Sequence, residues 1–221
     1  MLKGVIFDID GTLVDSNDAH AQSWVETFAE FGYEVPFDVV RPLIGMGGDK
    51  LLPKTVGVSN DSEQGKKLSR RRSEIFRQHY LPKLRPFAGS RELVLRIRAD
   101  DLKPIVATSA KDEELKGLLK AATVDDLMEE KATASDAKRS KPDPDIVHAA
   151  ISESGILPNA LVMIGDTPYD VEAAGRAGVR IIAFRCGGWN DDDLAGAVEI
   201  YDGPADLLSR YELSLIGKQR E

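Results

Sequence analysis

Short apolar runs alternate with helical patterns along most of the chain. Four runs are apolar nearly throughout and are expected to be strands covered on both faces: Leu2–Phe7, Pro104–Ala107, Ala160–Ile164 and Val179–Phe184. Apolar residues at helical spacing predict helices over Pro86–Ala99, Asp112–Lys120, Asp143–Ser154 and Pro168–Ala177. This alternation predicts an α/β fold with a doubly wound, Rossmann-like parallel sheet.

One region interrupts this alternation, because no strand pattern occurs between Ser16 and about Leu84. One helix is predicted because its apolar residues share a face: Ala21, Trp24, Val25, Phe28 and Phe31. A second, long helix with a basic exposed side is predicted from Leu68, Arg72, Ile75, Phe76 and Tyr80. We therefore expect residues 16–86 to form an inserted, all-helical cap domain. Residues 1–15 and 87–221 are expected to form the α/β core.

Composition narrows the class of protein. The 221 residues are 42% hydrophobic and 30% charged, the balance of an ordinary globular protein. A formal net charge of −8 argues against a nucleic-acid partner or an anionic membrane surface. No apolar run approaches the roughly 18 residues of a membrane span, and the first residues are typical of a strand and not of a signal peptide. Cys186 is the single cysteine, so no intramolecular disulfide and no structural zinc site are expected, and a cytoplasmic location is predicted.

Two carboxylates close the first predicted strand. Asp8 and Asp10 stand two residues apart in an extended stretch, so both side chains point the same way. In an open α/β sheet ligands bind beyond the carboxyl ends of the strands, and Gly11 permits the sharp exit from this strand. The plainer alternative is an Asp-Gly turn. Two like charges side by side are unfavourable without a cation, which favours a functional site.

Other polar residues follow the later strands. Asp166 follows the third strand of the chain, and Asp170 lies about one helical turn further on. The plainer alternative is that Asp166 and Thr167, directly before Pro168, simply begin a helix. The hydroxyls of Thr108 and Ser109 follow the second strand and could hold a phosphate oxygen or cap a helix. Lys141 stands in a proline-containing stretch that restricts the backbone, as suits a placed cation better than a solvated surface charge.

Together these residues predict a phosphate site with a metal ion. Oxygen ligands without His or Cys suit a hard divalent cation, Mg²⁺ above all. Such a site can neutralise a bound phosphate and leave one carboxylate free to attack it.

The same residues resemble four short motifs of the haloacid dehalogenase superfamily, in the branch with a helical cap after the first strand. The motifs occur in order: DIDGT from Asp8, Thr108, Lys141, and the GDTPYD stretch that holds Asp166 and Asp170. The resemblance covers essentially the whole chain. It points to the phosphoglycolate phosphatase-like and β-phosphoglucomutase-like members.

The resemblance implies a role for each matching residue. Asp8 would be the nucleophile that forms an aspartyl-phosphate, and Asp10 the general acid and then the base. Thr108 and Lys141 would bind the phosphoryl oxygens, and Ser109 is a further candidate for this task because its hydroxyl follows the same strand. Mg²⁺ would be held by Asp8, the backbone carbonyl of Asp10, Asp166 and, as ligand or support, Asp170. Because dehalogenases typically lack the second aspartate of the first motif, Asp10 favours phosphoryl transfer.

The cap is expected to select the leaving group. In similar proteins a cap loop supplies specificity, and the IGMGGDK stretch at 44–50 matches its position. The candidate specificity residues are His20, Arg41, Gly47 and Lys50. An alternative is that these are surface charges beside a flexible glycine turn.

The predicted function is a Mg²⁺-dependent phosphatase acting on a small phosphorylated metabolite, phosphoglycolate- or sugar-phosphate-like, as a monomer or homodimer. A mutase resembling β-phosphoglucomutase is the main alternative, with His20 and Trp24 in similar places. Against it, Gly165 precedes Asp166 where mutases tend to show a Glu-Asp pair. A phosphonoacetaldehyde hydrolase would need a Schiff-base lysine in the cap, for which Lys50 and Lys54 are available. A further alternative, from a different class of protein, is a non-catalytic aspartyl-phosphate sensor such as a receiver domain. The predicted helical insertion argues against it, because receiver domains have none.

Overall fold

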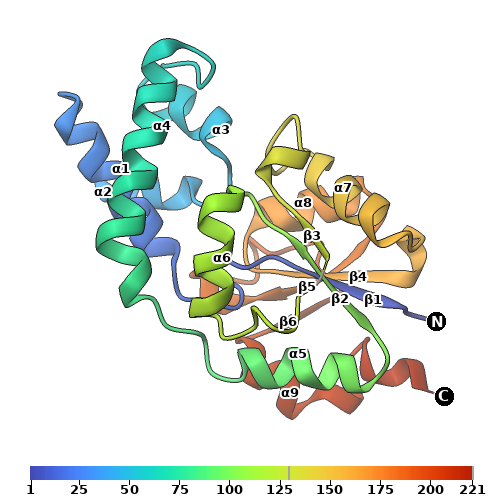
Figure 1. Cartoon of the computed structure of the whole chain (residues 1–221). Coiled ribbons are helices and arrows are strands. Elements are labelled where there is room, and N and C mark those ends of the chain that lie inside the picture. The colour runs from blue at the N-terminus through green and yellow to red at the C-terminus, as the bar shows by residue number, and fades with distance from the viewer. Residues whose placement is uncertain (129, 221) are drawn as a thin grey trace.

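A computed structural model describes residues 1–128 and 130–220. In this part of the chain six strands form one parallel sheet in the order β3-β2-β1-β4-β5-β6 (Figure 1). The strands are β1 (Gly4–Phe7), β2 (Lys103–Ala107), β3 (Glu130–Ala132), β4 (Leu161–Gly165), β5 (Arg180–Phe184) and β6 (Glu199–Tyr201). The chain winds outward from β1 in both directions, which confirms the doubly wound α/β fold.

Helices cover both faces of the sheet. They are α5 (Ser90–Ala99), α6 (Asp112–Ala121), α7 (Asp145–Ser154), α8 (Pro168–Arg176) and α9 (Pro204–Ser209). Val5 and Phe7 of β1 belong to the apolar cluster that includes residues of α5, α6 and α9, whereas Ile6 packs with residues of α7 and α8. Side chains alternate between the two faces of a strand, so a strand buried on both sides is apolar throughout.

The central strand sets the position of the site. Phe7 is in register with Val106 of β2 on one side and Ile164 of β4 on the other. Because the strands are parallel, the residues that follow all three emerge at the same edge of the sheet. This edge is the switch point of the topology, where ligands bind in open α/β sheets.

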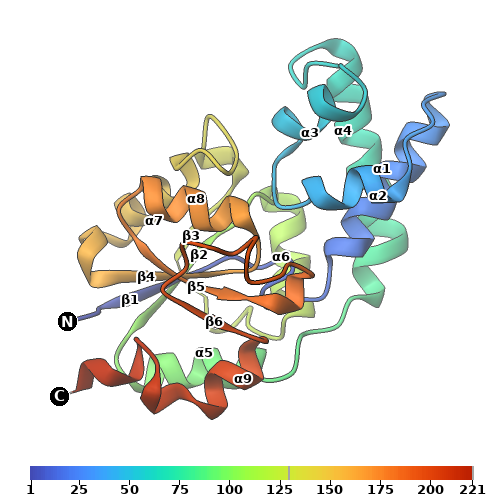
Figure 2. The same ribbon diagram turned by 180° about the vertical axis from the view of Figure 1, so that it is seen from behind.

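The segment between β1 and α5 is helical and has an apolar core of its own. It contains α1 (Asn17–Glu30), α2 (Phe37–Val40), α3 (Gly48–Thr55) and α4 (Glu63–Ile75), with a π-helical turn over Phe76–Tyr80. Its buried apolar residues are Ala21, Trp24, Phe28, Val40, Ile44, Leu51, Leu52 and Leu68. Figure 2 shows α1–α4 gathered to one side of the sheet. We keep residues 16–86 as the proposed extent of this cap.

Several element boundaries differ from the sequence-based expectation. The short strands β3 and β6 were not predicted. Helix α5 begins at Ser90 and not at Pro86, because Gly89 has a left-handed φ of 82° directly before it. Helix α7 begins at Asp145 and not at Asp143. Phe31, expected on the buried face of α1, follows the end of that helix and is 38% exposed. Within residues 1–128 and 130–220, no helix combines the length and apolar character that a membrane crossing requires.

Candidate active site

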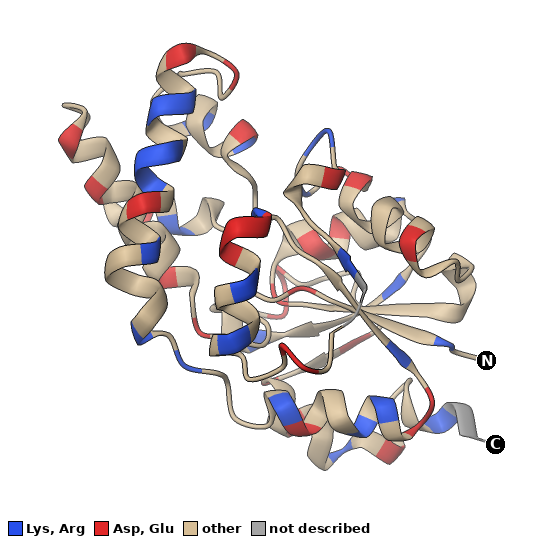
Figure 3. Cartoon of the chain, in the orientation of Figure 1, with Lys and Arg blue, Asp and Glu red and all other residues tan. Residues whose placement is uncertain are grey.

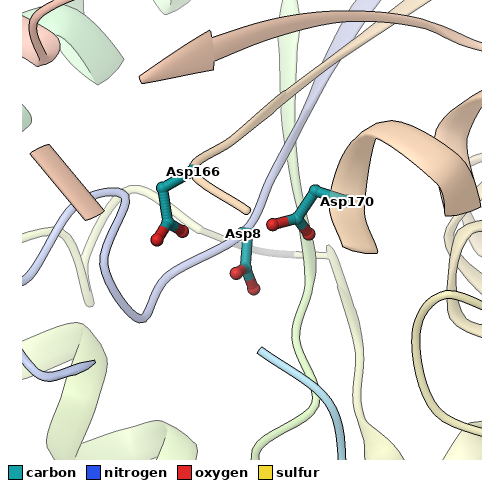
Figure 4. A group of neighbouring side chains, drawn as sticks. All are labelled: Asp8, Asp166 and Asp170. Carbon is teal, nitrogen blue, oxygen red and sulfur yellow. The ribbon is translucent and has the colours of Figure 1, made fainter. Parts of the chain in front are cut away.

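Three aspartates meet at the carboxyl edge of the sheet. Asp8 follows β1, Asp166 follows β4, and Asp170 lies in the first turn of α8. One carboxylate oxygen from each lies within 4.8 Å of the others, and all three residues are buried. Figure 4 shows the three carboxyl groups converging from these separate elements. The structure thus brings together three of the sequence-predicted metal ligands.

The Asp166 carboxylate is held by residues of the loop after β1 and by the start of α1. Thr12 Oγ1 donates to Asp166 Oδ1 at 2.8 Å, and Asn17 Nδ2 donates to Oδ2 at 2.9 Å. Gly11 has a φ of 72°, and a Cβ there would lie 2.2 Å from Asp166 Oδ2. The turn therefore needs glycine for both its conformation and its close approach. Sequence reasoning did not assign this role to Thr12 or Asn17.

Asp170 serves the helix and the site at once. Its Oδ2 accepts hydrogen bonds from the Thr167 N–H at 3.0 Å and from Thr167 Oγ1 at 2.6 Å, and Thr167 Oγ1 accepts from the Asp170 N–H at 3.2 Å. This is a capping box, which stabilises the helix start. The helix-start alternative is therefore correct for Thr167, which is the N-cap of α8, while Asp170 Oδ1 faces Lys141.

Lys141 is a buried cation and not a solvated surface charge, with only 1% of the residue exposed. Its Nζ lies 2.9 Å from Asp8 Oδ1 and 2.7 Å from Asp170 Oδ1. Burial alone would lower the pKa of this lysine, but the charges of Asp170 and Asp8 outweigh it and raise the pKa. Lys141 is therefore a fixed ammonium beside Asp8.

The charge balance of this group fits a divalent cation. Burial, with repulsion from Asp170 and Asp10, raises the pKa of Asp8 to about 7 against the attraction of Lys141. Burial and the charges of Asp170 and Asp8 also raise the pKa of Asp166 well above its ordinary value. Three buried carboxylates thus face one ammonium and resist ionising together. A Mg²⁺ ion would supply the missing positive charge, and the oxygen donors suit it.

The Asp10 carboxylate lines the same cavity as Asp8 and contacts the first helix of the cap. Its Oδ1 accepts a hydrogen bond from Ser16 Oγ at 2.6 Å and lies 2.7 Å from His20 Nε2. Burial would raise the pKa of Asp10, but interactions with His20, the Ser16 hydrogen bond and the charge of Arg72 lower it below its ordinary value. These contacts favour the ionised form of Asp10, and proton transfer by its side chain and metal binding by its backbone carbonyl both stay predictions.

His20 connects Asp10 to a buried ion pair between the cap and the core. Arg72 Nη2 lies 2.7 Å from His20 Nδ1, and Arg72 Nη1 donates to both oxygens of Glu114 at 3.0 and 2.9 Å. Glu114 is buried in α6, and His20 stacks on Phe76 with ring centroids 4.0 Å apart. Figure 3 shows the basic residues of α4 and the acidic start of α6 that these contacts join. In the sequence, Arg72 shares the apolar face of its predicted helix, which is a signal that its charge has a partner in the folded protein. No sequence pattern indicates that Glu114 is this partner.

Thr108 and Ser109 lie directly after β2 and line the cavity beside Asp8. Thr108 Oγ1 accepts a hydrogen bond from the Ala110 N–H at 3.1 Å, so this residue also shapes the loop. Ser109 Oγ is buried and has no hydrogen-bond partner in the described part of the chain. The cavity has a volume of about 270 Å³ and is lined by both the core and the cap. An unpaired buried hydroxyl indicates a position for a ligand oxygen.

The candidate specificity residues separate into two groups. His20 and Gly47 line the cavity, whereas Arg41 and Lys50 are not among its described lining residues. Arg41 donates to the Gly187 carbonyl at 2.7 Å and to Asp18 at 2.6 Å, and Lys50 pairs with Asp143. The ammonium of Lys50 is therefore directed at the core.

The site has the buried acidic cluster, fixed lysine and paired hydroxyls of a phosphoryl-group hydrolase at the switch point of an α/β sheet. The family model described as "Haloacid dehalogenase-like hydrolase" matches residues 5–184. The chain belongs to this family, which confirms the resemblance found in the sequence.

Relatives with assigned names share this region. The chain is 33% identical over 195 residues to Protein SUPPRESSOR OF QUENCHING 1, chloroplastic, of Arabidopsis thaliana, with 83% of this chain aligned but only 18% of that protein's length. It is 31% identical to a protein of Caldanaerobacter subterraneus provisionally named pyrophosphatase PpaX, covering 83% of this chain and 82% of the other. It is 27% identical to a phosphoglycolate phosphatase of Nitrosospira multiformis, with 84% of each chain covered. The last name agrees with the predicted enzyme class, a phosphoric monoester hydrolase.

Solved structures share the whole fold. A hydrolase from Pseudomonas syringae superimposes with a TM-score of 0.87 and 29% identity, over 96% of this chain and 98% of that one. A Bacteroides vulgatus protein provisionally named beta-phosphoglucomutase gives a TM-score of 0.84 and 27% identity, over 96% of this chain and 88% of that one. These structures agree with the predicted branch of the family.

Proposed function

We propose that this hydrolase is a Mg²⁺-dependent phosphatase that cleaves a small phosphate monoester through an aspartyl-phosphate on Asp8. The observation that carries the proposal is the position of Asp8, which lines the cavity, contacts Lys141 and shares a buried acidic group with Asp166 and Asp170. The phosphatase names among the relatives support the same reaction.

The first step is attack of a carboxylate oxygen of Asp8 on the phosphorus atom. As the new P–O bond forms, the bond to the leaving oxygen breaks, and Asp10 gives its proton to that oxygen. Thr108, Ser109 and Lys141 hold the phosphoryl oxygens by hydrogen bonds and charge. Bound by Asp8, Asp166 and Asp170, a magnesium ion would offset the negative charge of the site and of the phosphate.

The second step returns Asp8 to its starting state. Asp10, now ionised, takes a proton from a water molecule whose oxygen attacks the phosphorus atom, and the P–O bond to Asp8 breaks. Ser16 and His20 both contact Oδ1 of Asp10, so we assign proton transfer to its Oδ2. The cap residues around the cavity would exclude other water during the first step.

A panel of phosphate esters with Mg²⁺ tests this proposal. We expect wild-type protein to release phosphate and Asp8→Asn to lose all turnover while keeping its circular dichroism spectrum. Asp125→Asn makes the same change at an exposed aspartate that is not among the residues of the acidic group or the cavity. It is the matched control and is expected to behave as wild type. Turnover by Asp8→Asn at the wild-type rate would refute the proposal.

A sugar-phosphate mutase is the second candidate, supported by the Bacteroides vulgatus structure and by His20 beside Asp10. Supplying a hexose 1-phosphate and measuring the 6-phosphate product distinguishes a mutase from a phosphatase. A phosphonoacetaldehyde hydrolase and a receiver domain fit less well. Lys50 is engaged by Asp143 and Lys54 is exposed, so neither is placed as a Schiff-base lysine, and a receiver domain lacks helices α1–α4.

We propose a small phosphorylated metabolite as the substrate, a monomer or homodimer as the working form, and the cytoplasm as the location. Phosphoglycolate and sugar phosphates are the first substrates to test.

A further inference from the structure

The first turn of cap helix α3 contacts the core segment that carries Lys141. Asp49 Oδ1 accepts a hydrogen bond from Ser140 Oγ at 2.5 Å, and Asp49 Oδ2 accepts one from the Ser140 N–H at 3.2 Å. The Lys50 ammonium forms an ion pair with Asp143 Oδ2. Ser140 precedes Lys141 by one residue and Asp143 follows it by two. We call these interactions of Asp49 and Lys50 with Ser140 and Asp143 the closure contacts.

Gly47 allows the cap to come this close. A Cβ at Gly47 would lie 2.7 Å from Ser140 Cβ and 2.9 Å from Ser140 Oγ, closer than real Cβ atoms approach. The φ of Gly47 is −78°, which any residue can adopt. Glycine is therefore needed here for space and not for its backbone conformation. This is an observation independent of the two polar contacts.

The ion pair is sheltered and its core partner is anchored. The side chains of Lys50 and Asp143 are 24% and 15% exposed. Asp143 also faces Arg139 Nη1 at 3.3 Å and Arg176 Nη1 at 3.5 Å. The two arginines hold Asp143 on the core, so Lys50 is the partner that the cap contributes. A pair of this kind is worth more than a fully exposed one.

We propose that Asp49 and Lys50 are positioning residues that fix the Lys141 segment only when the cap is closed. Lys141 lies between their two partners in the sequence, and its ammonium contacts Asp8 at 2.9 Å. Closing the cap therefore aligns the ammonium that holds the transferring phosphoryl group, and small misplacements of such groups slow a reaction strongly. This inference rests on the proposed function, which gives Lys141 that task.

The competing explanation is that Lys50 binds the substrate directly. The two explanations differ in what Asp143 does. If Lys50 is a positioning residue, it acts through Asp143, and removal of either partner has the same effect. If Lys50 binds substrate, removal of Asp143 leaves it free to do so.

A double-mutant cycle in kcat and KM separates the two. We expect Lys50→Ala and Asp143→Ala each to lower kcat about tenfold with a smaller change in KM, and the double variant to fall no further, because contacting residues are not additive. Lys50→Arg keeps the ion pair and is expected to retain most of the activity. Lys67→Ala removes an exposed lysine of α4 and is the matched control, expected to match wild type.

Two outcomes would overturn the proposal. One is a rise in KM for Lys50→Ala with no effect of Asp143→Ala, which would make Lys50 a substrate contact. The other is a pair of single effects that multiply in the double variant, or no effect in either single variant.

Hydrogen exchange provides a readout that does not depend on catalysis. The Ser140 amide donates to Asp49, so Asp49→Ala is expected to speed its exchange about tenfold. Unchanged exchange would overturn the closure contacts even in an active enzyme. If wild-type protein hydrolyses no phosphate ester, the proposed function fails, and exchange at Ser140 still tests the contacts by themselves.

Discussion

His20 Nε2 of the cap lies 2.7 Å from Asp10 Oδ1 of the core, and the geometry around the histidine fixes which nitrogen carries the proton. The other ring nitrogen faces Arg72 Nη2 at 2.7 Å. A guanidinium group can only donate, so Nδ1 accepts and the proton resides on Nε2. His20 therefore donates a hydrogen bond to the Asp10 carboxylate.

Removing this donor is expected to change the pH profile. Burial raises the pKa of Asp10 and His20 lowers it, so in His20→Ala the pKa of Asp10 rises above its wild-type value. The first step needs protonated Asp10, so the limb of the kcat profile that reports this group moves to higher pH. We also expect kcat to fall about tenfold because the carboxylate is no longer oriented, less than the roughly 10²- to 10⁴-fold expected for Asp10→Ala.

The profile is measured on the preferred ester in the presence of Mg²⁺. His148→Ala replaces an exposed histidine of α7 and is the control. A His20→Ala profile that coincides with that of wild type would show that His20 does not act on Asp10.

The Arg72–Glu114 pair is expected to contribute to stability. Glu114 is buried, and removing one partner of such a pair leaves the other charge uncompensated, at a loss of about 3 kcal/mol. Burial would raise the pKa of Glu114, but Arg72 and His20 lower it below its ordinary value. The stabilisation that Glu114 provides is therefore fully present above the pKa that this glutamate has in the unfolded chain. It is lost as the pH falls through the lower pKa of Glu114 in the folded protein.

Urea unfolding of Glu114→Gln at neutral pH measures this loss. Glu113→Gln changes the neighbouring glutamate, which is exposed and pairs with Arg77, and is expected to lose less than about 1 kcal/mol. Equal losses for the two variants would contradict the account of the buried pair.

Metal binding and pH are expected to act together through Asp8. Its pKa is raised from 3.8 to about 7, so the folded protein keeps a proton that the unfolded chain releases. Stability from this group therefore falls as the pH rises from 3.8 to about 7 and is lowest above that range. Mg²⁺ should raise the melting temperature more at about pH 8 than at about pH 5, because protons no longer compete with it there.

Asp8→Asn supplies the comparison. It carries no such proton, so without metal we expect it to gain stability relative to wild type between about pH 5 and about pH 8. It should also lose most of the stabilisation by Mg²⁺. Thermal unfolding at the two pH values with and without Mg²⁺ measures both effects, and a Mg²⁺ shift equal in the two proteins would exclude Asp8 as a ligand.

Two glycines pack against the acidic group and should tune its affinity for metal. A Cβ at Gly187 would lie 1.9 Å from Asp166 Oδ2, and one at Gly11 would lie 2.2 Å from the same atom. We expect Gly187→Ala and Gly11→Ala to displace Asp166 and weaken Mg²⁺ binding at least tenfold by titration calorimetry. Gly175→Ala lies in helix α8 with open space around it and should bind normally. Normal binding by all three variants would contradict the placement of Asp166.

Much of the fold could be predicted because the buried strands carry a local signal. Gly4–Phe7 and Leu161–Gly165 are apolar throughout, since each is covered by helices on both faces. The residues after these strands then had to meet at one edge, which placed Asp8 and Asp166 correctly. The strands Glu130–Ala132 and Glu199–Tyr201 are three residues long and lie at the two edges of the sheet, too short for a pattern to emerge.

The contacts between cap and core could not be predicted in the same way. Arg72 and Glu114 are 42 residues apart, and Lys50 and Asp143 are 93 apart. Their pairing depends on how the two parts dock, and no spacing rule within one element reports it. Charged residues such as Lys50 therefore looked like candidates for substrate contact, while their protein partners stayed hidden.

Transient phosphorylation of Asp8 is the central step of the proposed reaction. The direct measurement is rapid acid quenching of the wild-type protein during turnover of a phosphate ester with Mg²⁺, followed by peptide mass spectrometry. We predict a phosphoryl group on Asp8 that disappears once the substrate is consumed and that is absent from Asp8→Asn. Turnover with no phosphorylated Asp8 at any quench time, or phosphorylation at another residue, would contradict this mechanism.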